Sequence, residues 1–161
     1  GNNATRKVII GNAEWNTVTR IEGNDTFANA LPASDRNIIV TFHMYEPFCF
    51  THYNPENPKD FPPSCRTWNG SSNDKALTIR ALDAAVAFGQ KHNRPVYIGE
   101  WGAYTTTDYA SRARYFRFVQ AELNKRNLDW AFWDFASDSF GIFNPATDRF
   151  YPELINAVFN R

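Results

Sequence analysis

The sequence lacks the features that mark nucleic-acid-binding, membrane and metal-binding proteins. Lys and Arg together number 17, as do Asp and Glu, so neither sign of charge favours nucleic acid or a membrane surface. No apolar run approaches the roughly 20 residues that a membrane-spanning helix needs. The three histidines, His43, His52 and His92, do not have the spacing of metal ligands. We therefore expect no nucleic-acid or membrane partner and no metal site.

Two common cofactor and catalytic motifs are missing as well. The sequence has no glycine-rich phosphate loop and no nucleophile elbow around a serine or cysteine. We therefore expect no cofactor. Aromatic residues are plentiful instead, at 16% of the 161 residues. Large rings fill protein cores, and they also offer flat faces on which sugars stack.

Cysteine is scarce, and both cysteines fall in one segment. Cys49 and Cys65 lie within residues 48–72, an irregular stretch with four prolines. A stretch of this length that follows a strand favours a binding loop. A bond between the two sulfurs would stabilise the fold by roughly 3 kcal/mol, but two free thiols fit the sequence equally. We expect a secreted, extracellular protein, in which the two cysteines would be bonded.

The length of the chain and its pattern of elements indicate one α/β domain. We expect a tail over residues 1–5 and a single domain over 6–161. Neither an initiator Met nor a signal peptide is present, so we expect a processed chain or a fragment. Strand and helix alternate four times, which predicts parallel strands joined by right-handed crossovers. The expected strands are 6–11, 37–43, 96–100 and 130–135, and the expected helices are about 25–31, 72–92, 108–126 and a last one that begins at Pro152.

The two long helices have caps and buried stripes that the sequence predicts. Ser72 or Asn73 is the expected cap of the first, and Thr107 of the second. The expected buried residues, at helical spacing, are Leu77, Leu82, Ala85, Val86 and Gly89 in the first helix and Ala113, Phe116, Val119 and Leu123 in the second.

The strand over residues 96–100 ends on a glutamate beside a tryptophan. Its apolar run predicts a buried parallel strand, and the carboxyl ends of such strands are where an α/β barrel places its chemistry. Strict alternation would put Val96, Ile98 and Glu100 on one face, with Glu100 projecting into the cavity at the strand ends. The alternative is an ordinary surface glutamate at the junction of strand and loop.

The other strand ends carry side chains of the same kind. Every one of the four expected strands ends in a polar or aromatic group of the type that a sugar site uses. These groups are Glu14 and Trp15, His43 and Tyr45, Glu100 and Trp101, and Trp133.

These segments resemble glycoside hydrolase family 5, the endo-β-1,4-glucanase or cellulase family. They match the C-terminal half of the family's barrel, in the family's order and over nearly the whole chain. The matching pieces are Val8–Gly11 with Glu14–Asn16, Asn37–His43 with Tyr45–Pro47 and Phe50–His52, Ile98–Tyr104, and Trp130–Phe135 followed by Phe140–Gly141.

The resemblance implies a half (β/α)8 TIM barrel, with four β/α units that correspond to strands five to eight. It implies that Glu100 is the catalytic nucleophile, and that His43 and Tyr45 flank and orient it. Trp133 matches the aromatic platform beneath the reacting sugar. Trp15 and His52 are candidates for neighbouring subsites, and Trp101 is a further candidate platform. The implied substrate is a β-glucan or cello-oligosaccharide.

Several active-site residues of the family have no counterpart in this sequence, among them its Arg, His and Asn from the first four strands. The family's acid/base glutamate follows an asparagine at the end of the fourth strand, and no such segment is present. Retaining hydrolysis needs two carboxyl groups roughly 5–5.5 Å apart. Glu14 is a candidate substitute acid, whereas Glu46, which immediately precedes Pro47, is expected to shape the loop.

Half a barrel also predicts a partner. Four parallel strands leave two open edges and an uncovered inner face, so we expect a second copy or a complementary N-terminal half-barrel to close the ring. The alternative is rearrangement into an open sheet or a swapped oligomer. The expected function is the nucleophile half of a retaining β-1,4-glucan hydrolase that is weakly active or inactive alone. The alternatives are a non-catalytic β-glucan-binding module and a structural half-barrel that self-assembles.

Overall fold

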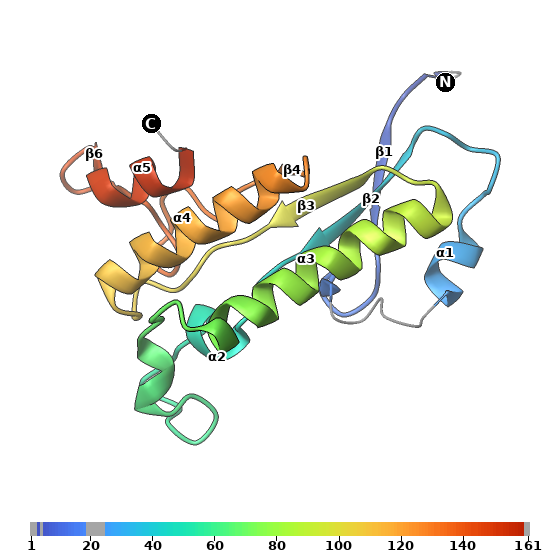
Figure 1. Ribbon diagram of the computed structural model, residues 1–161. Coiled ribbons are helices and arrows are strands. Elements are labelled where there is room, and N and C mark those ends of the chain that lie inside the picture. Colours follow the sequence, from blue (N-terminus) through green and yellow to red (C-terminus); the bar gives the residue numbers. More distant parts are fainter. Residues whose placement is uncertain (1–2, 4, 19–24, 160–161) are drawn as a thin grey trace.

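The computed structural model describes residues 3, 5–18 and 25–159, so residues 1, 2 and 4 of the expected tail lie outside the described part. Four strands form one parallel sheet in the order β1-β2-β3-β4, which is also their order along the chain. The strands are β1 (Val8–Gly11), β2 (Ile38–His43), β3 (Val96–Glu100) and β4 (Asp129–Trp130). The predicted alternation of parallel strands and helices is therefore confirmed (Figure 1).

The helices and the remaining strands complete the fold. Two short strands, β5 (Phe143–Asn144) and β6 (Arg149–Phe150), pair antiparallel near the C-terminus. None of the helices in the described ranges has the length and apolar character that crossing a membrane requires. The helices are α1 (Thr26–Ala30), α2 (Phe48–Thr51), the 3-10 helix η2 (Pro63–Arg66), α3 (Ser72–His92), α4 (Tyr109–Lys125) and α5 (Pro152–Phe159).

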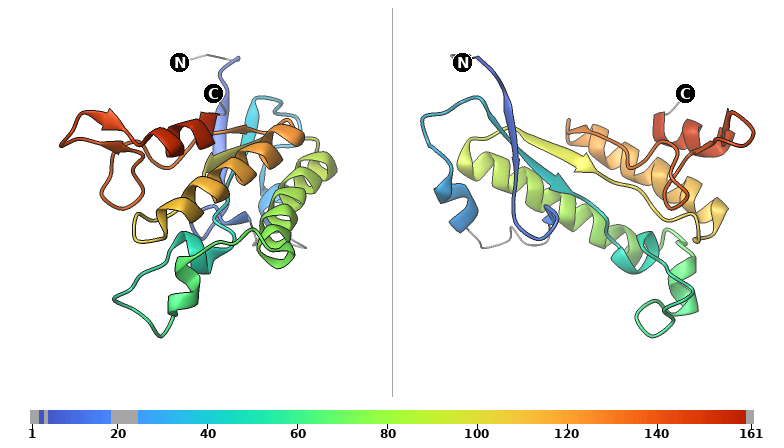
Figure 2. Two further views of the ribbon diagram at one scale, coloured as in Figure 1. Left: turned by 60° about the vertical axis from the view of Figure 1, so that its left-hand side comes forward. Right: turned by 180° about the vertical axis from the view of Figure 1, so that it is seen from behind.

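The core lies between the sheet and the two long helices. Helix α3 lies in front of the strands in Figure 1 and behind them in the reverse view of Figure 2, so it covers one face of the sheet. Val40, Phe42 and Ile98 on this face are fully buried in a cluster with residues of α3 and α4. On β1, Ile9 is 56% exposed. An exposed Ile at the end of the sheet leaves apolar surface for another element to cover.

The two long helices form as expected but are capped one residue away from the prediction. The hydroxyl of Ser71 caps α3 by accepting from the backbone N–H of Asp74, and the Asp74 carboxylate accepts from the N–H of Ser71 in return. Asp108 caps α4 by accepting from the N–H of Ser111. The predicted caps Ser72, Asn73 and Thr107 are therefore wrong. The capping oxygen comes from the residue immediately before each helix, which is Ser71 for α3 and Asp108 for α4.

The predicted buried residues of α4 are confirmed, and so are Leu82, Ala85 and Gly89 in α3, whereas Val86 is half-buried and the prediction for Leu77 is wrong. Leu77 is 48% exposed, and the neighbouring Thr78 is fully buried in its place. Thr78 tolerates burial because its hydroxyl donates to the carbonyl oxygen of Glu46 at 2.7 Å. A pattern of apolar residues alone does not identify a buried polar residue whose partner lies far along the chain.

The last strand of the sheet is shorter than the expected residues 130–135. Only Asp129 and Trp130 pair regularly with β3. Beyond them the backbone follows β3 through single hydrogen bonds, such as that from Trp133 N–H to the Trp101 carbonyl at 2.9 Å. The carbonyl of Phe135 accepts from the N–H groups of residues 142 and 143. The chain therefore turns toward the β5–β6 hairpin, which ends the strand.

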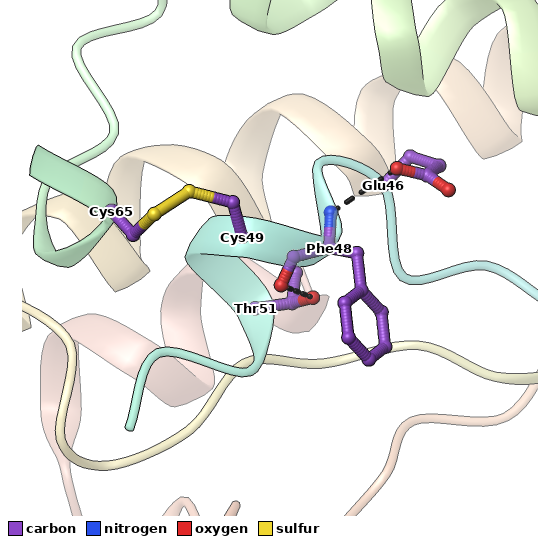
Figure 3. Close-up of a disulfide and its surroundings, with 5 residues drawn as sticks. All are labelled: Glu46, Phe48, Cys49, Thr51 and Cys65. Carbon is purple, nitrogen blue, oxygen red and sulfur yellow. Dashed lines mark hydrogen bonds between the residues drawn. A yellow bond between two sulfur atoms is a disulfide. The ribbon is translucent and has the colours of Figure 1, made fainter. Parts of the chain in front are cut away.

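The segment over residues 48–72 contains the elements α2 and η2 and a disulfide bond. Cys49 in α2 is bonded to Cys65 in η2, with a distance of 5.2 Å between their Cα atoms (Figure 3). The expected disulfide is present, and the alternative of two free thiols is wrong for this structure. Closing a loop of this length stabilises a fold by roughly 3 kcal/mol, because it restricts the unfolded chain.

Candidate active site

A pocket of about 540 Å³ lies at the carboxyl ends of the strands. It brings together side chains from all four strand ends, as expected for parallel strands that end at one edge of a sheet. A larger hollow of about 710 Å³ on the outer surface of α3 contains no aromatic or histidine side chain, so we place the chemistry in the strand-end pocket. The residues that line this pocket are Trp15, Thr17, Val18, His43, Tyr45, Glu46, Phe48, His52, Glu100, Trp133 and Phe140.

Glu100 is held in this pocket by two neighbouring donors. Its Oε2 atom accepts from the hydroxyl of Tyr45 at 3.0 Å and lies 3.1 Å from Nδ1 of His43. Burial, together with the negative charge of Glu100, raises the pKa of Tyr45 well above its usual range. The phenol therefore stays protonated and donates. Both contacts involve Oε2, so Oε1 takes part in neither of them.

A register shift in the sheet brings Glu100 to the face of the sheet that carries His43. Phe42 is paired with Ile98, but the next residue of β2, His43, is paired with Glu100. Gly99 is therefore an extra residue in β3, as in a β-bulge. A Cβ atom on Gly99 would lie 2.4 Å from Oγ1 of Thr41, so only glycine fits there.

The bulge corrects the expected side-chain directions in β3. Ile98 is fully buried in the core. Val96 faces α3, since a Cβ atom on Gly89 of that helix would lie 2.7 Å from Cγ2 of Val96. Glu100 reaches the opposite face, where it contacts His43. The prediction that Val96, Ile98 and Glu100 share one face is therefore wrong, although Glu100 does project into the pocket.

The hydrogen bonds of His43 determine which ring nitrogen carries the proton. Its Nε2 atom lies 3.2 Å from the amide nitrogen of Asn16. That amide can only donate, so Nε2 accepts and the proton sits on Nδ1, where it is donated to Glu100. Burial lowers the pKa of His43, against the opposing effect of the Glu100 charge. A neutral imidazole that donates to Glu100 is the form that all these contacts favour.

The sequence did not assign a role to Asn16. Glu14, Trp15 and Asn16 all have left-handed backbone angles, with φ of 58°, 54° and 59°. Three successive non-glycine residues in this region are uncommon and cost free energy that the surrounding fold must offset. The turn brings the Asn16 side chain to the place that a Cβ atom on Gly11 would occupy. The polar residues that follow Gly11 indicate a loop, but they do not predict a left-handed turn at Asn16.

The aromatic residues of the site separate into exposed platforms and core residues. Trp15 is 87% exposed and Trp133 is 44% exposed, and both line the pocket. Trp101 is fully buried, where its ring packs edge-on against Phe116 and Phe132. The interpretation of Trp101 as a sugar platform is therefore wrong. It follows Glu100 directly, so its side chain points to the helix side of the sheet.

The two other strand-end glutamates differ in their positions. Glu46 lines the pocket, and its Oε2 atom accepts from the N–H of Phe48 at 3.1 Å, as a loop-shaping residue does (Figure 3). Glu14 is not among the residues that line the pocket. The structure therefore does not place Glu14 opposite Glu100, and a role as substitute acid remains a prediction for this residue.

His52 is a neutral residue of the pocket, and we expect it to make folding stability depend on pH. Burial lowers its pKa to about 4, whereas the ordinary value is 6.5. Between these values the unfolded chain binds more protons, so stability is lost as pH falls from 6.5 to 4. Wild type should lose about 1 kcal/mol more than His52→Gln over this window, a value reduced for the partial exposure of the ring. Urea unfolding at both ends of the window measures this difference, and equal losses in the two proteins would contradict it.

Comparison with known proteins places the chain in a family. The family model "Cellulase (glycosyl hydrolase family 5)" matches residues 1–139. Endoglucanase H of Acetivibrio thermocellus is 32% identical over 164 aligned residues, which cover 98% of this chain and 16% of that protein. Endoglucanase A of Clostridium longisporum is 28% identical over 94% of this chain and 28% of its own length.

Solved structures agree with these sequence matches. The structure of Thermotoga maritima Cel5A in complex with cellobiose superposes with a TM-score of 0.82 and 34% identity, covering 95% of this chain and 48% of that one. The cellulose synthase subunit Z of Clostridioides difficile gives a TM-score of 0.81 at 27% identity, covering 98% of this chain and 50% of that one. The chain thus spans about half the length of these structures. It belongs to the cellulase family, glycosyl hydrolase family 5.

Proposed function

We propose that this chain carries the nucleophile half of a retaining β-1,4-glucan hydrolase and that Glu100 is the nucleophile. The observation that carries the proposal is the geometry of Glu100: Tyr45 and His43 both contact Oε2 at the base of a pocket. The exposed rings of Trp15 and Trp133 flank the same pocket and offer faces for sugars. Membership of the cellulase family supports glycosidase chemistry at this site.

In the proposed reaction, Oε1 of Glu100 attacks the anomeric carbon of the bound glucosyl unit. The glycosidic C–O bond breaks, and the leaving oxygen takes a proton from a carboxylic acid. The result is a glycosyl ester on Glu100. The carboxylate that gave up its proton in the first step then deprotonates a water molecule. The water attacks the anomeric carbon, the ester bond breaks, and the free Glu100 carboxylate is restored. Tyr45 and His43 fix the orientation of the nucleophile through Oε2.

We assign the acid/base carboxyl group to a complementary N-terminal half of the barrel. Among the described residues that line the pocket, Glu46 is the one carboxylate besides Glu100, and it is engaged with the Phe48 N–H. This supports a chain that is weakly active or inactive alone. The positions of the four strands as strands five to eight of the barrel are part of the same proposal.

A binding role is the second candidate function. Exposed tryptophans in a pocket that lacks a second uncommitted carboxylate fit a β-glucan-binding module that does not turn over its ligand. Hydrolysis of a soluble β-glucan separates the first function from the second. Tryptophan quenching by a cello-oligosaccharide separates binding from a purely structural half-barrel. We also propose a secreted location, which the Cys49–Cys65 bond supports.

The test of the proposed function is covalent trapping of Glu100. A β-cellobioside with a dinitrophenolate leaving group and fluorine at C2 needs no acid to depart, and the fluorine slows release of the ester. Incubation with the full chain should add one sugar moiety per chain, located at Glu100 by mass spectrometry of its peptides. Labelling elsewhere, or none in a protein that binds cellobiose, would contradict the assignment.

We expect the chain to form dimers in solution. The edges of β1 and β4 lack neighbouring strands within the described part of the chain, and Ile9 is 56% exposed. Open apolar edges favour pairing with another chain. Sedimentation velocity should give a dimer, and Ile9→Lys should shift the population toward monomer. A stable, folded monomer in dilute wild-type protein would contradict this expectation.

A further inference from the structure

Phe48 is an exposed aromatic residue at the rim of the pocket that the proposed reaction does not use. It is the first residue of α2, it lines the pocket, and it is 52% exposed. Its ring stacks on the ring of His52, with 4.1 Å between centroids and 16° between planes. One face of the phenyl ring is therefore covered and supported. The remaining exposed surface suits the apolar face of a pyranose ring.

Helix α2 is too short to be stable by itself, and contacts on several sides hold it. The Glu46 carboxylate accepts from the N–H of Phe48 at 3.1 Å, and the hydroxyl of Thr51 donates to the Tyr45 carbonyl at 2.6 Å. The disulfide from Cys49 ties the helix to η2. Figure 3 shows the Phe48 ring pointing away from α2 and away from the disulfide. The bond therefore fixes the helix without covering the ring.

The support beneath the Phe48 ring also offers a hydrogen-bond acceptor. Thr51 has one hydroxyl proton, which goes to the Tyr45 carbonyl, so its oxygen accepts from Nδ1 of His52 at 3.0 Å. His52 is neutral because burial keeps its pKa at about 4. Its Nε2 atom is then an acceptor for a sugar hydroxyl. The stacked pair thus combines a flat apolar surface with one polar group, as sugar sites require.

A second ring extends this surface within the loop that the disulfide closes. The centroid of Phe61 lies 6.2 Å from that of Phe48, and the two planes are tilted by 40°. Phe61 lies between Cys49 and Cys65 in the sequence, so the bond limits how far its ring can move from Phe48.

We propose that Phe48, supported by His52 and extended by Phe61, forms an additional glucan-binding subsite that the Cys49–Cys65 bond holds in place. It binds a pyranose ring of a β-1,4-glucan chain beyond the sugar that occupies Glu100. The inference rests on the proposed function for the nature of the ligand. The disulfide-bonded segment would then give the chain a preference for longer oligosaccharides.

Calorimetric titration of the full chain with cellobiose and with cellotetraose tests the subsite. Wild type should bind cellotetraose more tightly. Phe48→Ala should weaken cellotetraose binding roughly tenfold, the loss expected for removing a half-buried aromatic contact, and weaken cellobiose binding clearly less. Phe48→Trp should retain the preference for the longer sugar. Reduction and alkylation of the two cysteines should cause the same selective loss as Phe48→Ala.

The control is Phe159→Ala, which removes a phenyl ring of similar exposure, 47%, from α5 outside the pocket. This variant should bind both sugars as wild type does. Equal affinity of wild type for the two sugars, an equal loss for both in Phe48→Ala, or a loss in Phe48→Trp would overturn the subsite. Retention of the preference after reduction would overturn the role of the disulfide. Covalent labelling of Glu100 tests the proposed function separately, since cellobiosides do not need the additional subsite.

Discussion

Replacing Glu100 with alanine is expected to lower cleavage of dinitrophenyl β-cellobioside by about 10⁴-fold or more, because in the proposed reaction it removes the atom that attacks the sugar. The activated leaving group departs without a proton, so the assay measures the nucleophile alone. Release of dinitrophenolate, followed by its absorbance, gives the rate. The matched variant Tyr45→Phe removes one hydrogen bond to the carboxylate at 3.0 Å and should lower the rate by roughly 10- to 100-fold.

Rescue by a small anion distinguishes a lost nucleophile from a damaged fold. In Glu100→Ala, azide can enter the space left by the carboxylate and attack the anomeric carbon from the same side. The product should be an α-glycosyl azide, and the rate should rise with azide concentration. Tyr45→Phe keeps the carboxylate and should show no such rescue. An unchanged rate in Glu100→Ala, or rescue that gives the β-azide, would remove Glu100 from the role of nucleophile.

The general arrangement of this site could be predicted from the sequence. Parallel strands place their carboxyl ends at one edge of a sheet, so the order of strands was enough to bring Glu100, His43, Tyr45 and Trp133 to one pocket. The resemblance to the cellulase family added roles to these positions. The long helices were also predictable, since each combines a helical apolar stripe with a capping residue close to the expected place.

Other features depended on contacts that local patterns do not contain. Alternation in β3 fails because Gly99 is an extra residue, and its need for glycine arises from Thr41 on the neighbouring strand. Trp101 belongs to the core because Phe116 of α4 packs against its ring there. Asn16 contacts His43 through a left-handed turn that few sequences adopt. Each of these features is set by residues distant along the chain, so local propensity could not identify them.

Without a complementary half, we expect the lack of a proton donor to limit the rate of glucan hydrolysis by the chain. If two copies close one barrel, the position of the missing fourth strand falls to the partner's residues 130–135. In this chain Trp133 from that segment lines the pocket and is 44% exposed, so an indole ring would stand where the acid/base carboxyl is required. General acid assistance contributes roughly 10²–10⁴-fold to such reactions. We therefore expect a homodimer to bind glucan and to hydrolyse it poorly.

Adding the first half of a family 5 cellulase is expected to raise hydrolysis of carboxymethylcellulose by roughly 10²–10⁴-fold. The gain should be much smaller on dinitrophenyl β-cellobioside, because that leaving group needs no proton. A first half with its acid/base glutamate changed to glutamine is the matched control, and it should restore assembly without the gain. High turnover of carboxymethylcellulose by the chain alone, abolished in Glu100→Gln, would show that the homo-oligomer contains an acid. Glu14→Gln and Glu46→Gln would then identify this acid. Only the variant that lacks the proton donor should lose activity on carboxymethylcellulose and keep activity on the dinitrophenyl substrate.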